Sequence, residues 1–77
     1  MNQKLKDIIS AINGKKVEIE ETTNLSKDLS FTSIHFVQLI VEIESTFGFE
    51  FRDEEMDLSQ LENVGNLNKI ICEHIEL

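Results

Sequence analysis

DLSFTSIHFVQLIVEIESTFGFEF, residues 28–51, is the stretch from which the rest of this chain is best understood. At about 100° per residue, its middle part places apolar side chains on one broad arc of a helix and polar side chains opposite. The apolar arc comprises Phe36, Val37, Leu39, Ile40, Ile43 and Phe47, and the polar arc comprises His35, Gln38, Glu42, Ser45 and Thr46. Ile34 and Val41 lie at the border between the arcs, either in the core or exposed, whereas Glu44 falls inside the apolar arc and must lean outward or find a cation. The pattern predicts a helix over residues 33–47.

The start of this helix is where the sequence points to chemistry. Thr32 or Ser33 can cap the helix, and Gly48 suits the left-handed residue just past its end. Ser33 therefore lies in the first turn, where free backbone N–H groups and the positive end of the helix dipole favour a phosphate group. On this local pattern alone, Ser33 is either a helix cap or an attachment point for a phosphate-bearing group.

The remaining apolar patterns predict helices on both sides of this stretch. A first helix near residues 3–13 ends at Gly14, a short one lies near 58–62, and Asn63 caps a last one near 64–75. Residues 17–32 are expected to form an ordered loop anchored by Leu25 and Leu29, and residues 52–57 a solvated acidic linker. The inward stripes comprise Leu5, Ile8, Ile9 and Ile12 in the first helix and Val64, Leu67, Ile70, Ile71 and Ile75 in the last. The predicted fold class is all-α, a small four-helix bundle with three main helices and one short helix.

Length and charge restrict the possible functions. The 77 residues allow one domain, residues 1–77, and the net charge of −8 argues against nucleic-acid and membrane partners and favours basic proteins. One cysteine cannot form an internal disulfide, and nothing resembles a signal peptide or a membrane span, so we expect a cytoplasmic monomer. Cys72 and His74 have no second pair of metal ligands nearby, and the acidic linker lacks the spacing of a calcium loop, so no metal site is predicted.

The motif around Ser33 resembles that of the carrier proteins of fatty-acid, polyketide and nonribosomal-peptide synthesis. In that family Asp-Leu-Gly-x-Asp-Ser-Leu/Ile precedes a helix that ends in Phe-Gly-x-x-hydrophobic. The matching positions here are Asp28, Leu29, Ser33, Ile34, Phe47, Gly48 and Phe51. The resemblance covers nearly the whole chain, because Val64-Gly65 followed by a last helix also fits.

The resemblance implies a carrier that performs no catalysis of its own. Ser33 aligns with the serine that receives 4'-phosphopantetheine from coenzyme A, and the arm then holds acyl or aminoacyl groups as thioesters. The implied partners are a phosphopantetheinyl transferase, an acyl- or aminoacyl-loading enzyme of the acyltransferase or adenylation type, and downstream synthase enzymes. The alternative is an unmodified adaptor that has the carrier fold and binds a partner without a prosthetic group.

Two positions depart from the family pattern. Ser30 stands where the family favours Gly, which costs about 1 kcal/mol only if the backbone there has a positive φ. Thr32 stands where the family favours Asp, an acid that helps transferases of the fatty-acid type to recognise their carrier. The second departure favours a stand-alone carrier of a polyketide or nonribosomal-peptide pathway.

The family also implies where partner enzymes dock. The shoulder of the long helix and the residues before it give an expected partner-binding surface of Asp28, Thr32, Ile34, His35, Gln38, Val41 and Glu42. A catalytic pair of Ser33 and His35 is disfavoured, because residues two apart on a helix point about 200° apart.

Overall fold

The computed structural model describes residues 2–15 and 17–75, and within these ranges the chain is helical. The described elements are α1 (Gln3–Asn13), α2 (Leu25–Leu29), α3 (Ser33–Phe47), the 3-10 helix η1 (Asp53–Glu55), α4 (Leu58–Leu61) and α5 (Val64–Ile75). The described residues contain no strand, only an isolated bridge between Asn24 and Asn63. The all-α prediction is confirmed, and the three main helices have the predicted ranges 3–13, 33–47 and 64–75.

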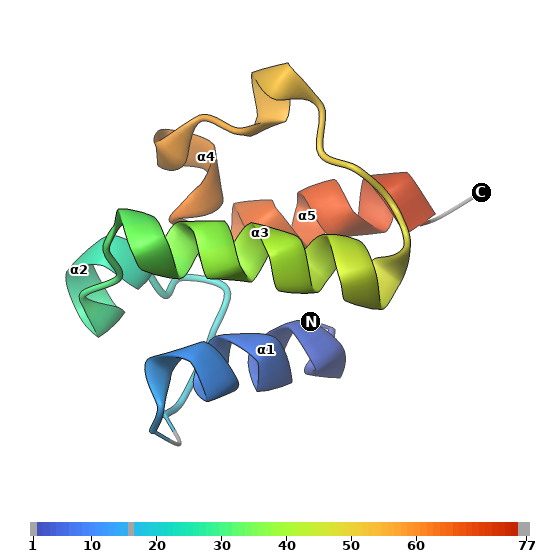
Figure 1. Cartoon of the computed structure of the whole chain (residues 1–77). Coiled ribbons are helices and arrows are strands. Elements are labelled where there is room, and N and C mark those ends of the chain that lie inside the picture. Colours follow the sequence, from blue (N-terminus) through green and yellow to red (C-terminus); the bar gives the residue numbers. More distant parts are fainter. Residues whose placement is uncertain (1, 16, 76–77) are drawn as a thin grey trace.

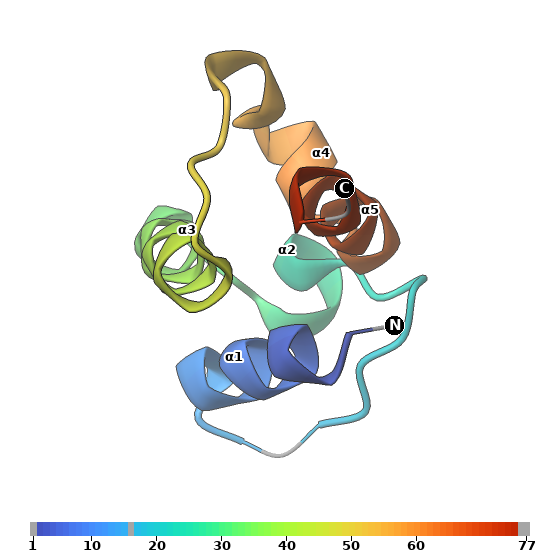
Figure 2. The same cartoon turned by 90° about the vertical axis from the view of Figure 1, so that its right-hand side faces the viewer.

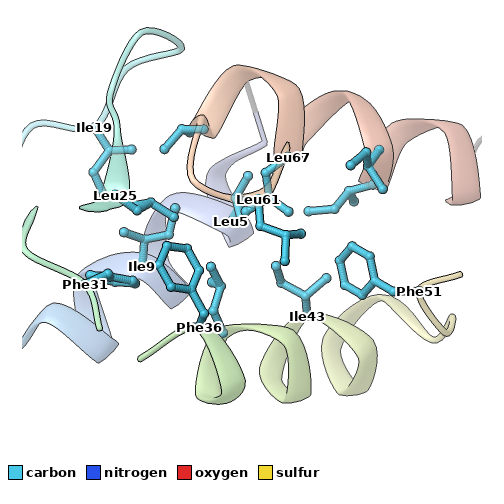
Figure 3. Packing of buried hydrophobic residues seen from close by; sticks show 14 residues of the cluster. Leu5, Ile9, Ile19, Leu25, Phe31, Phe36, Ile43, Phe51, Leu61 and Leu67 are labelled. Atoms are coloured by element: carbon cyan, nitrogen blue, oxygen red, sulfur yellow. The ribbon is translucent and has the colours of Figure 1, made fainter. Parts of the chain in front are cut away.

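The three long helices surround one apolar core. α1 packs against α3, and α4 packs against α5. Viewed along the long helices, α1, α3 and α5 form a triangle (Figure 2), and α2 lies at the end where α3 begins (Figure 1). Figure 3 shows side chains from every α-helix meeting in this space. The buried apolar residues are Leu5, Ile9, Ile19, Leu25, Phe31, Phe36, Leu39, Ile43, Phe51, Leu61, Val64, Leu67, Ile70 and Ile71.

α2 is a difference from the predicted loop over residues 17–32. Asn24 Oδ1 accepts the backbone N–H of Lys27 at 2.8 Å, and Asp28 Oδ2 accepts the backbone N–H of Asn24 at 2.8 Å. These two hydrogen bonds stabilise α2, which is too short for apolar residues to repeat at helical spacing and so was not predicted. Leu25 is fully buried, as expected of an anchor, whereas Leu29 is half-buried.

The segment before α2 is held against the start of α5. The backbone N–H of Gly65 donates to Glu21 O at 2.9 Å, and that of Val64 donates to Thr23 O at 3.0 Å. A Cβ atom at Gly65 would lie 2.8 Å from Glu21 O, so the close approach of the two backbones requires glycine.

Two residues assigned to apolar stripes are exposed. Val37 is exposed, because α3 contacts the core through the buried Phe36, Leu39 and Ile43 and the half-buried Ile40 and Phe47, and this arc does not include Val37. Ile75 is exposed in the last turn of α5, one turn beyond the buried Ile71. The predictions that these two residues point inward are wrong.

Glu44 follows neither of the two expectations for it. Its Oε2 accepts the backbone N–H of Phe51 at 2.9 Å, seven residues further along the chain. The carboxylate thereby holds the chain after Gly48, whose φ of 74° ends α3, in the path that returns Phe51 to the core.

The acidic linker is also more ordered than predicted. It contains η1, whose Glu55 Oε1 accepts the backbone N–H of Arg52 at 2.8 Å and lies 2.7 Å from His74 Nε2 on α5. The His74 ring is stacked on Phe49, with ring centroids 4.3 Å apart and planes 7° apart. One cluster of three side chains therefore ties the segment between α3 and α4 to the end of α5.

Candidate functional site

The turn between α2 and α3 presents Ser33 to solvent. Ser30 ends α2 in the left-handed conformation, with φ of 58°, and the backbone N–H of Phe31 donates to Leu25 O at 2.9 Å. The Phe31 side chain is buried, which fixes the turn to the core, while Thr32 and Ser33 are exposed. Because φ at Ser30 is positive, serine at this position is less stable than the glycine that the family favours.

Thr32 and His35 form the cap of α3. The backbone N–H of Thr32 donates to His35 Nδ1 at 2.9 Å, and Thr32 Oγ1 lies 3.0 Å from the same nitrogen. Because Nδ1 accepts the Thr32 N–H, it carries no proton in this arrangement. The imidazole also stacks on Phe31, with ring centroids 5.0 Å apart, so His35 is half-buried rather than fully in solvent as its place on the polar arc predicts.

Ser33 itself is the first residue of α3, with Thr32 at the N-cap position. Its hydroxyl is exposed beside backbone N–H groups that have no carbonyl partner within the helix. A phosphate group attached to this oxygen would lie at the positive end of a helix of 15 residues. His35 Nδ1, the nitrogen of the candidate base nearest in sequence, accepts the backbone N–H of Thr32.

The seven residues of the expected partner-binding surface are not all in one place. Thr32 and His35 flank Ser33, and Ile34, Gln38, Val41 and Glu42 are exposed along α3. Asp28 is exposed on α2, where its carboxylate caps the backbone N–H of Asn24. The sequence did not reveal this capping role of Asp28. Its only signal is an Asn followed four residues later by an Asp, and no repeat of apolar residues at helical spacing lies next to this pair.

A groove that the sequence did not reveal begins at Ser33. It has a volume of about 500 Å³ and lies between the first turns of α3 and the segment that carries α4. Its lining is mostly apolar, including the exposed Met56 and Leu58 and the buried Leu61. Met56, Leu58 and Leu61 are distant from Ser33 in sequence. The only feature of the sequence that could have indicated the groove is that these apolar residues lie in or next to an acidic stretch. The residues lining the groove are Ser26, Phe31, Thr32, Ser33, Phe36, Val37, Ile40, Met56, Leu58 and Leu61.

The surroundings of Ser33 fit a phosphodiester that continues into a partly apolar chain. The helix terminus would provide N–H groups for a phosphate on Ser33, and the groove would provide apolar surface for a chain beyond it. Within residues 2–15 and 17–75 there is no group of three His, Cys, Asp or Glu residues that could hold a metal ion. None of the helices in the described part of the chain is long and apolar enough to cross a membrane.

Comparison with known proteins gives the family. Residues 3–69 match the family described as the phosphopantetheine attachment site. The chain is 36% identical over 70 residues to an acyl carrier protein of Coprothermobacter proteolyticus, covering 90% of this chain and 83% of that protein. It is 32% identical over 75 residues to an acyl carrier protein of Rickettsia bellii, covering 96% and 85%. A third acyl carrier protein, from Lactobacillus johnsonii, is 37% identical over 57 residues, covering 74% and 69%. The chain therefore belongs to the family of acyl and peptidyl carrier proteins, which hold 4'-phosphopantetheine covalently and are not enzymes.

Proposed function

We propose that Ser33 carries the 4'-phosphopantetheine and that this chain presents acyl or aminoacyl groups, held as thioesters, to partner enzymes. The observation that carries the proposal is the position of Ser33, an exposed hydroxyl at the first residue of α3 from which a mostly apolar groove extends. The attached group supplies a terminal thiol for thioester formation. The chain supplies a rigid helix terminus for the phosphate and apolar surface for the cargo.

The proposed pathway is a polyketide or nonribosomal-peptide pathway rather than housekeeping fatty-acid synthesis. Support comes from Thr32, which replaces the family's acid directly before Ser33. Thr32 joins a cap with His35, so this end of α3 carries an imidazole and a hydroxyl where the family has a carboxylate. A transferase of broad specificity, a loading enzyme of the adenylation or acyltransferase type, and downstream synthase enzymes are the proposed partners. A cytoplasmic location fits the single cysteine, Cys72, which is free.

The proposed partner surface combines the seven residues expected from the sequence. Ile34 and Val41 supply exposed apolar area on α3, and Glu42 supplies an exposed carboxylate beside them. His35 contributes through the cap of α3, which sets the direction in which Ser33 is presented. A basic partner would be attracted by the net charge of −8 and held by apolar contact.

The test is intact mass after incubation with coenzyme A and a broad-specificity phosphopantetheinyl transferase. We expect the wild-type chain to gain one phosphopantetheinyl group and Ser33→Ala to gain none. Circular dichroism should show the Ser33→Ala variant folded, because a capping side chain is worth about 1 kcal/mol or less when Thr32 remains at the N-cap. Ser30→Ala is the matched control, since Ser30 is also exposed and lies three residues before Ser33, and it should be modified normally.

The other outcomes each have a meaning. Modification that persists in Ser33→Ala and disappears in Ser30→Ala would show that the attachment residue is Ser30. A wild-type chain that resists several transferases would support the second candidate function, the unmodified adaptor. The only support for the adaptor in the sequence is the departure from the family pattern at Ser30 and Thr32.

A further inference from the structure

The Ser33 groove is the mostly apolar groove of about 500 Å³ that begins at Ser33, and its two walls belong to different parts of the fold. One wall is α3, which contributes Phe36. The other wall is the segment of residues 52–60, which contributes Met56 and Leu58. Figure 2 shows α4, which includes the end of this segment, next to α5 and apart from α3. The width of the groove therefore depends on how residues 52–60 are held on α5.

Residues 52–60 have few buried contacts of their own. Phe51 before them and Leu61 after them are buried in the core. Within residues 52–60, all of which the structure describes, Glu55 and Gln60 are half-buried and the others are exposed. The wall is therefore attached to the rest of the fold mainly through these two residues.

Both half-buried residues bind α5, one near each end of that helix. Asn66 Nδ2, in the first turn of α5, donates to Gln60 O at 2.9 Å. His74 Nε2, in the last turn, donates to Glu55 Oε1 at 2.7 Å, because a carboxylate oxygen can only accept. Gln60 Nε2 donates to Glu54 O at 3.3 Å, which joins η1 to α4. The two attachment points thus lie on either side of the residues that line the groove.

His74 is held in the orientation that its contact with Glu55 requires. The His74 ring stacks on Phe49, with ring centroids 4.3 Å apart and planes 7° apart, and the Phe51 ring packs edge-on at 6.4 Å. The side chains of His74 and Glu55 are each 13% exposed, so water competes little for their hydrogen bond. His74 is not among the residues that line the groove, so it can act on the groove only through the wall.

We propose that His74 is a positioning residue for the Ser33 groove: its hydrogen bond to Glu55 holds the wall of residues 52–60 on α5 and so sets the width of the groove. The inference rests on the proposed function, because it takes this groove as the place where the apolar part of a thioester cargo lies. With the hydrogen bond in place, the apolar side chains of the wall stay opposite α3 and cover the cargo. Without it, the wall is attached to α5 only near α4, pivots there, and exposes the cargo to water.

The first experiment uses the unmodified full chain, with 13C-labelled Met, Leu and Ile methyl groups, and compares the wild type with His74→Phe. Phenylalanine keeps a ring that can stack on Phe49 but removes the hydrogen-bond donor. We expect the Met56 and Leu58 methyl groups to show exchange on the microsecond-to-millisecond timescale in the variant and not in the wild type, as measured by relaxation dispersion. The methyl signal of the buried Ile43 should be unchanged.

The second experiment uses the chain loaded through phosphopantetheine with either an octanoyl or an acetyl group, and it measures cleavage of the thioester by hydroxylamine. The octanoyl group has apolar surface for the groove to bury, whereas the acetyl group has little. We expect His74→Phe to accelerate cleavage of the octanoyl thioester by about 2- to 10-fold, the change that loss of one hydrogen bond gives in an equilibrium, and to leave acetyl cleavage unchanged. A general loss of stability would accelerate both reactions.

Ile12→Val is the matched control for stability. Ile12 packs on the core from α1, which lies across the core from residues 52–60 (Figure 1), so this variant is less stable but should behave as the wild type in both experiments. Phe49→Leu removes the ring on which His74 stacks and should reproduce the selective acceleration. The double variant of His74→Phe with Glu55→Gln should match His74→Phe alone, because the two changes remove one contact. If His74→Phe does not fold by circular dichroism, Glu55→Gln replaces it.

Three results would overturn the proposal. Met56 and Leu58 methyl groups that behave as in the wild type would show that the wall is held by other contacts. Equal acceleration of octanoyl and acetyl cleavage, or the selective acceleration in Ile12→Val, would show that His74→Phe acts through overall stability. If Ser33 accepts no phosphopantetheine, the proposed function fails, whereas the methyl measurement needs no modification and still decides whether His74 holds the wall.

Discussion

At the scale of single residues, Ser30 is the least favourable backbone position in the described chain. It is the one residue other than glycine with a positive φ, 58°, among residues 2–15 and 17–75. We predict that Ser30→Gly raises the free energy of unfolding by about 0.5–1 kcal/mol, because glycine adopts this conformation without strain although it gains entropy in the unfolded chain. The measurement is urea unfolding.

The control for Ser30→Gly is the same replacement at Ser45, which is exposed in the interior of α3. There glycine has no strain to remove, and it should lower the free energy of unfolding by about 0.5–1 kcal/mol. Two changes of identical chemistry should thus have opposite signs. Equal signs would mean that the left-handed conformation of Ser30 is not the reason.

Single residues also show the limit of sequence reasoning. The helical period identified Phe36, Leu39 and Ile43 correctly, because it reports which side chains share an arc. The helical period did not predict that Val37 is exposed or that Glu44 accepts a backbone N–H. Both outcomes depend on which other segments pack against α3. The carboxylate of Glu44 meets a backbone N–H seven residues away, and no local pattern contains that contact.

At the scale of elements, length decided which helices could be predicted. α1, α3 and α5 span at least three turns, so their apolar stripes repeat, and glycine in the left-handed conformation comes directly after α1 and α3. α2 and η1 have five and three residues, which is too short for a repeat. They are stabilised instead by single side chains that reach back to a backbone N–H, Asp28 in α2 and Glu55 in η1.

Gly65 connects two elements, and its replacement tests that connection. We predict that Gly65→Ala lowers the free energy of unfolding by up to about 2 kcal/mol. Alanine is favoured over glycine in a helix by about 1 kcal/mol, but a Cβ atom 2.8 Å from Glu21 O forces two backbones apart, at a cost of about 1–3 kcal/mol in a packed site. The local character of the change can be checked by hydrogen exchange, which should accelerate at the amides of Val64 and Gly65, since both donate to this segment. Increased stability would show that the segment yields without loss.

The contact between η1 and α5 should make stability depend on pH. Partial burial raises the pKa of Glu55, but hydrogen bonds from the Arg52 backbone and from His74, and the charges of both residues, outweigh burial and hold that pKa below its ordinary value. The Glu55 and His74 side chains are each 13% exposed, so solvent screens the pair only in part.

We predict that Glu55→Gln is less stable than the wild type near neutral pH and equally stable in strong acid. A glutamate in the unfolded chain takes up its proton near pH 4.3, and folded Glu55 does so at a lower pH. Its contribution is therefore complete above the unfolded pKa and is lost as the pH falls through the folded pKa. Thermal unfolding of both proteins between pH 7 and pH 2 gives the difference, in which the titration of the other carboxylates cancels. A difference that stays constant over this range would exclude the pair as the cause.

At the scale of the whole molecule, the candidate site was more predictable than its surroundings. The motif around Ser33 is contiguous, so the sequence contains both the serine and the cap that places it at a helix terminus. The Ser33 groove and a second groove, which lies between α1 and α3, are formed by segments far apart in the chain. Met56 and Leu58 line the first groove, and Ile8 and Ile12 line the second. Both grooves result from the packing of the helices, which patterns within each helix do not specify.

The net charge of −8 is also a property of the whole molecule, and it should oppose folding. We predict that raising NaCl from about 0.02 M to 0.5 M increases the free energy of unfolding by about 1 kcal/mol, because the Debye length falls well below 10 Å and the repulsion between carboxylates is screened. Screening also weakens attraction, but in the described ranges the one ion pair, His74 with Glu55, is mostly shielded from solvent. Replacing the exposed Glu18 and Glu21 by Gln should stabilise the protein at low salt and reduce the dependence on salt. Urea unfolding at several NaCl concentrations measures both effects. Stability that falls with salt would show that attractive pairs outweigh the repulsion between carboxylates.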